Sequence, residues 1–180
     1  MTAELSKSDL EPPSSDLGSS ITVEISDVSG SDCDLVPLES AIRATLQSHR
    51  VFGVEVSLLL TTDEHIRSLN LQYRGLDETT DVLSFGLPSD LSDSAPKLLG
   101  DIVISVPHAS RQAQVRNIPL NLELCYLAIH GALHLIGFQD ETDDEREGMM
   151  REMSKMAVAA GLPADPEWSS ILHSVEEAAR

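Results

Sequence analysis

The stretch "IHGALHLIGFQD", residues 129–140, lies in the most apolar part of the chain and carries His130 and His134 four positions apart. The segment around it, about residues 120–136, is apolar on nearly all sides, which is typical of a central, buried helix. Side chains four residues apart lie on one face of a helix, with their Cβ atoms about 5–6 Å apart. The spacing therefore predicts two imidazoles that project together from a buried helix.

Gly137 follows this segment at a position where helices commonly end, because glycine adopts the left-handed conformation at little cost. A turn there can bring Asp140 back to the face that carries the two histidines. Two nitrogens and one oxygen with a fourth position open form the ligand pattern of a catalytic zinc site. We therefore predict that His130, His134 and Asp140 bind one Zn²⁺, or another divalent metal, since a carboxylate also suits harder ions.

Alternative interpretations of the same residues stay open. Two histidines at this spacing also arise by chance, and buried histidines often only hydrogen-bond to the backbone. Asp140 can equally be a solvated loop acid in a site that no longer binds metal. The spacing also matches the metzincin protease pattern H-E-x-x-H-x-x-G-x-x-H, but Gly131 stands where those proteases need a glutamate as general base. The sequence therefore argues against peptide hydrolysis by that route.

Further along the chain in both directions, alternating and helical apolar patterns predict four strands and several helices. Strands are expected at about 20–27, 53–61, 80–87 and 98–106, and helices at about 37–50, 62–75, 107–117, 120–136 and 142–160. The last of these helices opens with the capping-box pattern T-D-D-E at Thr142 to Glu145. Together they predict an α/β (α+β) fold, with a small mixed four-stranded sheet covered by helices and a central, buried metal-binding helix.

The domain organisation is predicted from composition and pattern. Residues 1–19 are rich in Ser, Pro and acidic side chains, which is typical of a disordered leader. Residues 20–162 are expected to form a single metal-dependent hydrolase domain, and residues 163–180 a C-terminal helical extension. The turn-rich stretch 87–97 is expected to be a loop and a candidate mobile flap.

Charge and composition limit the location and the partners. The 180-residue chain has a formal net charge of −18, and acidic proteins bind nucleic acid poorly without specific contacts. Its two cysteines do not form a CxxC motif and are expected to be reduced thiols. The first residues lack the basic start and apolar run of a secretory signal, and no apolar run is long enough to span a membrane. We therefore predict a cytoplasmic protein that does not associate with a membrane.

Three blocks of the sequence resemble the YbeY-type endoribonucleases, also called rRNA maturation factors. The pattern H-G-x-L-H-L-x-G corresponds to residues 130–137. The pattern N-x-x-Y-R followed by T-D-V-L-S-F corresponds to Asn70, Tyr73, Arg74 and residues 80–85. The pattern G-D-I-V-I-S followed by a Q-A pair corresponds to residues 100–105 with Gln112 and Ala113. The blocks share the family's order and spacing, and the resemblance covers about residues 20–160.

This resemblance implies a small α/β metalloprotein that binds its metal through three ligands in a cleft. It implies a metal-dependent, single-strand-specific endoribonuclease that acts in rRNA maturation, including 16S-type 3′ end processing, and in ribosome quality control. The implied partners are single-stranded RNA, including rRNA, and the small ribosomal subunit or a ribosomal protein. The family's third histidine falls at Asp140, so the substitution bears on the identity and the affinity of the metal.

Three further residues are predicted to act on the substrate. Arg74 is predicted to be catalytic, because a planar guanidinium can hold two phosphate oxygens at once, and the family's matching arginine is functional. The alternative for Arg74 is a surface salt bridge with Asp77 or Glu78. Arg111 and Ser84 are predicted to bind substrate, and their alternatives are a solvated helix charge and ordinary strand packing.

Two other functions stay open, a metal-dependent hydrolase of another substrate such as peptide and a non-catalytic ribosome-assembly factor. An RNA enzyme with this negative charge is unusual, because contacts to phosphates normally supply much of the affinity. We therefore expect weak intrinsic binding of RNA that is helped by a partner. His108 follows the fourth predicted strand and is expected at the surface.

Overall fold

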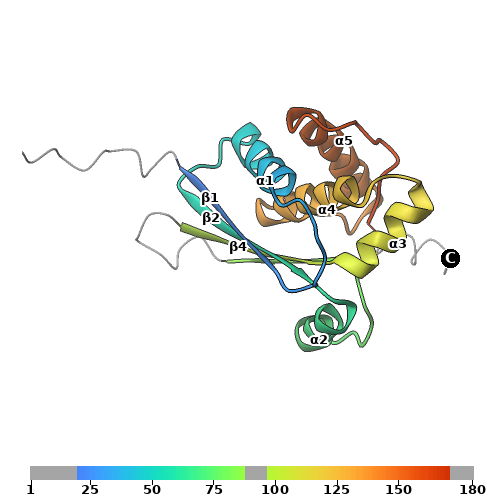
Figure 1. Cartoon of the computed structure of the whole chain (residues 1–180). Helices are drawn as coiled ribbons and strands as arrows, with labels where there is room; N and C mark the ends of the chain where they lie inside the picture. Colours follow the sequence, from blue (N-terminus) through green and yellow to red (C-terminus); the bar gives the residue numbers. More distant parts are fainter. Residues whose placement is uncertain (1–19, 88–96, 171–180) are drawn as a thin grey trace, which may run out of the picture.

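The structure is a computed structural model that describes residues 20–87 and 97–170 (Figure 1). Its four strands form one sheet in the order β1-β2-β4-β3, with β1, β2 and β4 parallel and β3 antiparallel to β4 at one edge. The strands are β1 (Ile21–Asp27), β2 (Val54–Thr61), β3 (Val82–Gly86) and β4 (Lys97–Ser105). The predicted small mixed four-stranded sheet is thereby confirmed.

The helices lie on both faces of this sheet (Figure 1). They are α1 (Val36–Ser48), α2 (Asp63–Arg74), α3 (Val106–Arg116), α4 (Leu120–Leu135) and α5 (Asp143–Ala159). Helices α1 and α4 pack on one face and α5 packs against both of them, whereas α2 lies on the opposite face. Helix α3 follows β4 directly and packs against α4.

The main apolar core lies between the sheet and the layer formed by α1 and α4. Val56, Leu58 and Leu60 of β2 are almost completely buried, and Ile102 and Ile104 of β4 lie beside them. These buried residues occupy every second position of each strand, because successive side chains of a strand point to opposite faces of the sheet. The other face carries a smaller apolar cluster beneath α2.

Helix α4 is buried along nearly its whole length, as its apolar composition predicts. It ends at Leu135, and Gly137 two residues later has a φ of 101°, in the left-handed region that glycine adopts readily. The chain reverses there, and the amide of Phe138 donates to the carbonyl of Leu133 at 3.1 Å. The predicted helix stop is therefore confirmed.

Parts of the predicted organisation lie outside the described residues. These are the leader at 1–19 and nearly all of the candidate flap, at 88–96. Residues 163–170, the first part of the predicted C-terminal helical extension, are described and contain no helix. Pro163 and Pro166 in this segment lack the backbone N–H that helix interiors require. The remainder of that prediction, 171–180, is not described.

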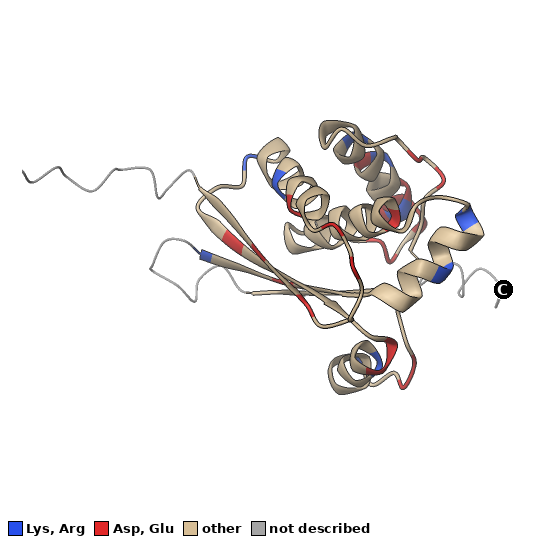
Figure 2. Cartoon of the chain, viewed as in Figure 1, with Lys and Arg blue, Asp and Glu red and all other residues tan. Residues whose placement is uncertain are grey.

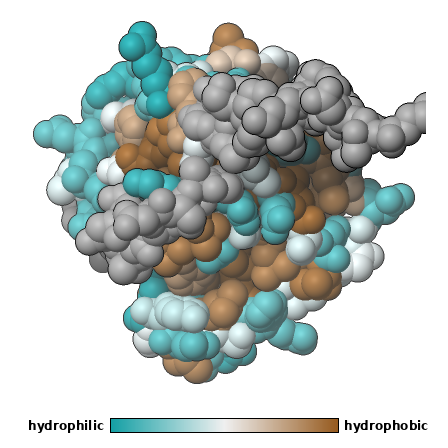
Figure 3. All heavy atoms as spheres, turned by 90° about the vertical axis from the view of Figure 1, so that its left-hand side faces the viewer, coloured by the Kyte–Doolittle hydropathy of each residue, from teal (hydrophilic) through white to brown (hydrophobic). Residues whose placement is uncertain are grey.

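The surface of the described part is mixed in polarity. Large exposed apolar side chains such as Phe52 and Leu98 are scattered among polar ones. Figure 3 shows both kinds on the face where the three parallel strands begin. Within the described residues, no helix has the length and apolar character needed to cross a membrane.

Candidate metal centre

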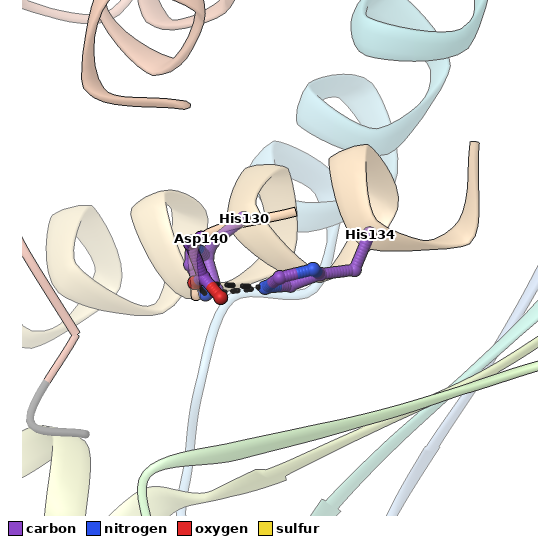
Figure 4. A group of neighbouring side chains, drawn as sticks. All are labelled: His130, His134 and Asp140. Atoms are coloured by element: carbon purple, nitrogen blue, oxygen red, sulfur yellow. Dashed lines mark hydrogen bonds and ion pairs between the residues drawn. The ribbon is translucent and has the colours of Figure 1, made fainter. Parts of the chain in front are cut away.

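The structure brings the three predicted ligands together. His130 and His134 project from the last turns of α4, and Asp140 approaches them from the loop that follows (Figure 4). The His134 Nε2 atom lies 3.0 Å from His130 Nε2 and 3.2 Å from Asp140 Oδ2, and the remaining pair is 3.5 Å apart. Ligand atoms around a tetrahedral Zn²⁺ at 2.0–2.1 Å are separated by roughly 3.3 Å. The three atoms are therefore spaced like three corners of such a site.

The turn at Gly137 also fixes the orientation of one ligand. The Nδ1 atom of His134 lies 2.9 Å from the carbonyl oxygen of Phe138, which can only accept a hydrogen bond. Nδ1 is therefore the protonated nitrogen of the neutral ring. Nε2 then carries the lone pair and faces the other two donor atoms, as metal-binding histidines require.

Arg146 of α5 holds the backbone of the loop that carries Asp140. Its guanidinium donates to the carbonyl oxygen of Asp140 at 3.3 Å and to that of Glu141 at 2.9 Å, and it forms an ion pair with Asp143. No motif in the sequence points to this arginine. The only sequence signal near it is the capping box, which fixes where α5 begins but not where its side chains point.

The capping box itself is present and closes the loop. The hydroxyl of Thr142 accepts from the amide of Glu145 at 3.3 Å, and the Glu145 carboxylate accepts from the amide of Thr142 at 2.9 Å. The hydrogen bond from the Thr142 backbone and that from its side chain lower the pKa of Glu145. The loop with Asp140 is therefore anchored by the Gly137 turn before it and by this cap after it.

Gly131 lies between the two histidines at a point where α4 touches the sheet. A Cβ atom at this position would lie 2.7 Å from the Cγ2 atom of Ile102 and 3.1 Å from the hydroxyl of Ser84. A glutamate like that of the metzincin proteases therefore cannot fit here without moving the helix. Ser84, a predicted substrate contact, donates its hydroxyl toward the carbonyl of Gly131 at 3.4 Å.

A cavity of about 360 Å³ adjoins two of the three predicted ligands. His130 and Asp140 form part of its wall, and the rest comes from residues 143–153 of α5 and from residues 168–170. The cavity is partly open to solvent. Space is therefore available next to the predicted metal position.

Arg74 and Arg111 do not line this cavity. Arg74 is the last residue of α2, on the opposite face of the sheet from α4, and its side chain is exposed. Asp77, an alternative partner for it, forms a two-bonded ion pair with Arg67 instead, at 2.8 and 2.9 Å. Arg111 is paired with Asp63, with 2.8 Å between Nη1 and Oδ2.

The expectation that His108 is at the surface is wrong. It is only 8% exposed, because α3 packs against α4, and this burial lowers the pKa of its imidazole, although the charge of Asp81 raises it in part. Asp81 itself is fully buried and accepts hydrogen bonds from the side chain of Gln112 at 2.9 Å and from the amide of Val82 at 2.8 Å. Asp81 thus orients its neighbours at the start of β3.

Glu123 and Trp168 form a second buried polar contact that the sequence analysis missed. Glu123 lies fully buried in α4, two turns before His130, and accepts from the indole Nε1 of Trp168 at 3.2 Å. Burial raises the pKa of Glu123 to about 7, although Arg116 at 3.9 Å opposes this. The Trp168 ring also lies 5.4 Å from the His130 ring. In the sequence, the one indication of this contact is the acidic residue Glu123 within a mostly apolar helix.

Known proteins are similar to this chain in sequence and in fold. Residues 31–160 match the family model described as endoribonuclease YbeY. A Desulforamulus reducens protein named endoribonuclease YbeY is 43% identical over 132 residues, which are 69% of this chain and 85% of that protein. A Heliobacterium modesticaldum protein of the same name is 46% identical over 110 residues, 56% of this chain and 66% of that protein.

A solved structure agrees with these sequence matches. The solution structure of TM1509 from Thermotoga maritima superposes with a TM-score of 0.55 and is 26% identical. The alignment covers 78% of this chain and 88% of that one. The similarity therefore extends over most of the chain, and the family match at 31–160 includes the cluster of His130, His134 and Asp140.

Proposed function

The chain belongs to the endoribonuclease YbeY family, and from this premise we propose that it is a metal-dependent endoribonuclease that cleaves single-stranded RNA. We propose that it acts in rRNA maturation, including 16S-type 3′ end processing, and in ribosome quality control. The observation that carries the proposal is the cluster of His130, His134 and Asp140, which lies inside the region that matches the family.

The metal that we propose is one Zn²⁺, held by these three residues. Two imidazole nitrogens and one carboxylate oxygen are ordinary zinc ligands, and their spacing fits a tetrahedral site. Among the described residues, the group contains no fourth His, Cys, Asp or Glu, so one coordination position is left for water or substrate. When bound, the ion would lower the pKa of that water and polarise a phosphate oxygen.

Asp140 bears on which metal is preferred. A carboxylate in place of a third imidazole adds negative charge at the ion and weakens it as a Lewis acid. It also makes the ligand set harder, which favours oxygen-preferring divalent ions more than three histidines would. Zinc is the first choice because two of the three donors are imidazoles, and manganese or another divalent ion is the alternative.

The chain's own residues orient the site. The Phe138 carbonyl sets the tautomer of His134, and Arg146 fixes the backbone at Asp140. Donor atoms that are held in place lose less conformational freedom when a ligand binds, so affinity and geometry both benefit. The protein's part in the reaction is therefore to hold the donors close together and to leave one side open.

We retain Arg74 as the catalytic cation, and the edge strand β3 supports this. Ser84 faces Gly131 of α4, whereas its neighbour Phe85 faces the other side and contacts the ring of Tyr73 at 4.9 Å. This contact places the end of α2 beside β3, and Arg74 is the next residue after Tyr73. An RNA strand that crosses β3 would pass both sites, and the guanidinium could then bind its phosphate.

Arg111 and Ser84 are proposed as further contacts to the RNA. The side chain of Arg111 is half exposed, so it can exchange Asp63 for a phosphate of the backbone. The hydroxyl of Ser84 lies on the edge strand that separates the metal-ligand cluster from Arg74. Both contacts would position the strand without reading its sequence.

We also propose that a partner strengthens the binding of RNA. In the described part, Lys and Arg are dispersed over α1, α2, α3, α5 and the start of β4 and do not form one continuous stripe (Figure 2). Thirty acidic residues oppose twelve basic ones in the whole chain. The small ribosomal subunit or a ribosomal protein is the proposed partner. A cytoplasmic location is proposed with it, since both cysteines are free thiols.

The test compares wild type with two variants in zinc-saturated solution. His134→Ala should lose both bound zinc and the cleavage of single-stranded RNA. Arg74→Ala should keep its zinc and lose about 100-fold or more in cleavage rate, as when one stabilising donor is removed. His65→Ala is the matched control, because His65 lies outside the cluster and, among the described contacts, its side chain bonds only to Thr61. Zinc is measured by mass spectrometry and cleavage on gels.

Each other outcome points to a different function. Equal cleavage by all four proteins would mean that the activity comes from a contaminant. Zinc binding by wild type without cleavage of any RNA would favour a metal-dependent hydrolase of another substrate. A protein that takes up no zinc after reconstitution but binds the small ribosomal subunit would be a non-catalytic assembly factor.

A further inference from the structure

The cavity beside the metal centre is not needed to hold the metal. It lies between the end of α4, residues 143–153 of α5 and the segment that carries Trp168. We propose that this cavity is a nucleobase subsite, which takes one unstacked base of the RNA whose adjoining phosphate lies at the metal centre. The inference rests on the proposed ribonuclease function and adds to it the part of the substrate that the cavity recognises.

The deeper wall of the cavity suits a flat, apolar ring. Met149 and Met153 of α5 are almost completely buried, Met150 is half buried, and Trp168 completes this side. Thioethers are polarisable and make favourable contacts with aromatic rings. A volume of about 360 Å³ is within the range of small-molecule sites, roughly 300–1,000 Å³. The space is therefore large enough for one base.

The charges around the cavity favour a base over a phosphate. Asp143 and Glu147 lie at its mouth, and both carboxylates are well exposed. Among the described lining residues, Arg146 is the only Lys or Arg, and it is already engaged by Asp143 and two backbone carbonyls. A phosphate would meet net negative charge there. The carboxylates can instead accept hydrogen bonds from the amino and imino groups of a base.

A buried hydroxyl in the wall also lacks a partner. Ser170 is only 1% exposed and lines the cavity, and its Oγ has no hydrogen-bond partner among the described residues. Leaving a buried polar atom unsatisfied costs free energy, which a ligand with a donor or acceptor would recover. The edge of a nucleobase carries both kinds of group.

The position of the cavity connects it to the proposed chemistry. His130 and Asp140 belong both to the metal-ligand cluster and to the cavity wall. A phosphate at the metal and the base of an adjacent nucleotide can therefore be bound at the same time. Proteins commonly recognise single-stranded RNA through bases that are splayed out of the stack. Such a subsite would explain a requirement for single strands, because paired bases cannot enter it.

The test has two parts: a protein variant in which a larger side chain fills the cavity, and an RNA substrate that lacks one base. Met150→Trp places a large side chain in the cavity, and a short single-stranded RNA is prepared with one abasic nucleotide at each position in turn. For wild type, one abasic position near the cleavage site should lower kcat/KM by about tenfold or more, the size expected when a stacked base is lost. Met150→Trp should lower kcat/KM on the intact RNA by a similar factor, and the abasic change should then cost nothing further.

Val158→Trp is the matched control. Val158 lies on the same helix, is 61% exposed and does not line the cavity, so this variant should behave like wild type. All three proteins should bind the same amount of zinc, which separates loss of the subsite from loss of the metal. The proposal is overturned if no abasic position matters, or if the effects of Met150→Trp and the abasic nucleotide multiply.

A second measurement does not depend on cleavage. Trp168 is the chain's single tryptophan, so its fluorescence in zinc-loaded wild type reports on the cavity. Intact RNA, followed by stopped flow before it is cut, should change the emission, and the RNA with the critical abasic position should not. A changed emission without any cleavage would refute the nuclease function and support the subsite. Cleavage with unchanged emission and a flat abasic scan would refute the subsite alone.

Discussion

At the scale of single residues, Arg146 binds the backbone of the loop that carries Asp140. The guanidinium donates to the carbonyls of Asp140 and Glu141, and the Asp140 carboxylate lies within 3.5 Å of both histidine rings. Residues that orient metal ligands commonly change metal affinity when they are replaced, by roughly 10–100-fold. Arg146 therefore belongs to the proposed metal site although it would contribute no ligand atom.

We predict that Arg146→Gln weakens zinc binding by about tenfold or more, because glutamine cannot donate to both carbonyls and to Asp143 at once. Competition with a chelator measures the affinity. Arg151→Gln is the control, since Arg151 is an exposed residue of the same helix whose partner is Glu147. Equal zinc affinity in the two variants would show that the loop holds Asp140 without Arg146.

At the scale of elements, the contact of α4 with the sheet sets where the histidines lie. Gly131 allows the helix backbone to approach Ile102 of β4 and Ser84 of β3 closely. A larger residue would push the helix away from the sheet, because protein interiors are close-packed and yield little. Close packing of α4 on the sheet therefore requires a glycine at position 131 in this chain.

We predict that Gly131→Ala lowers the free energy of unfolding by about 1–3 kcal/mol, as overpacking does. Gly148→Ala is the matched control in α5, where an added Cβ would have no neighbour within 4 Å. That change should raise the free energy of unfolding by about 0.5–1 kcal/mol, since alanine is the better helix former. Urea unfolding at one fixed zinc concentration measures both. The packing argument fails if the two variants change stability in the same direction.

At the scale of the whole molecule, Trp168 and Glu123 join the segment after α5 to the centre of α4. The contact links residues 45 positions apart in the sequence. Because Glu123 is fully buried, its carboxyl favours the neutral form, and its pKa is about 7 in the folded protein against 4.5 when it is exposed. The folded state thus binds a proton more tightly than the unfolded chain does.

This difference predicts how stability depends on pH. The contribution of the protonated Glu123 is complete below about pH 4.5 and is lost as the pH rises to about 7. Glu123→Gln should remove it, so the stability of wild type relative to the variant should fall by about 3 kcal/mol over this range. Urea midpoints of both proteins at several pH values give the difference. A difference that is constant with pH would contradict the assignment.

The sequence by itself determined the local features of this protein. The order and type of the described strands and helices α1 to α5, the Gly137 turn, the capping box at Thr142 and the pairing of His130 with His134 were all predicted. Each depends on residues within a few positions of one another, where backbone preference and side-chain periodicity act directly. The return of Asp140 was predictable for the same reason, since only a short loop separates it from α4.

Only the tertiary structure decided the contacts between distant segments. The close approach at Gly131 depends on how α4 packs against the sheet. The burial of His108, the pairing of Glu123 with Trp168 and the cavity beside His130 depend on how α3, α5 and residues 163–170 pack against α4. A sequence pattern shows that a residue will be buried but not which partner will bury it. Those partners are selected by the close packing of the complete core.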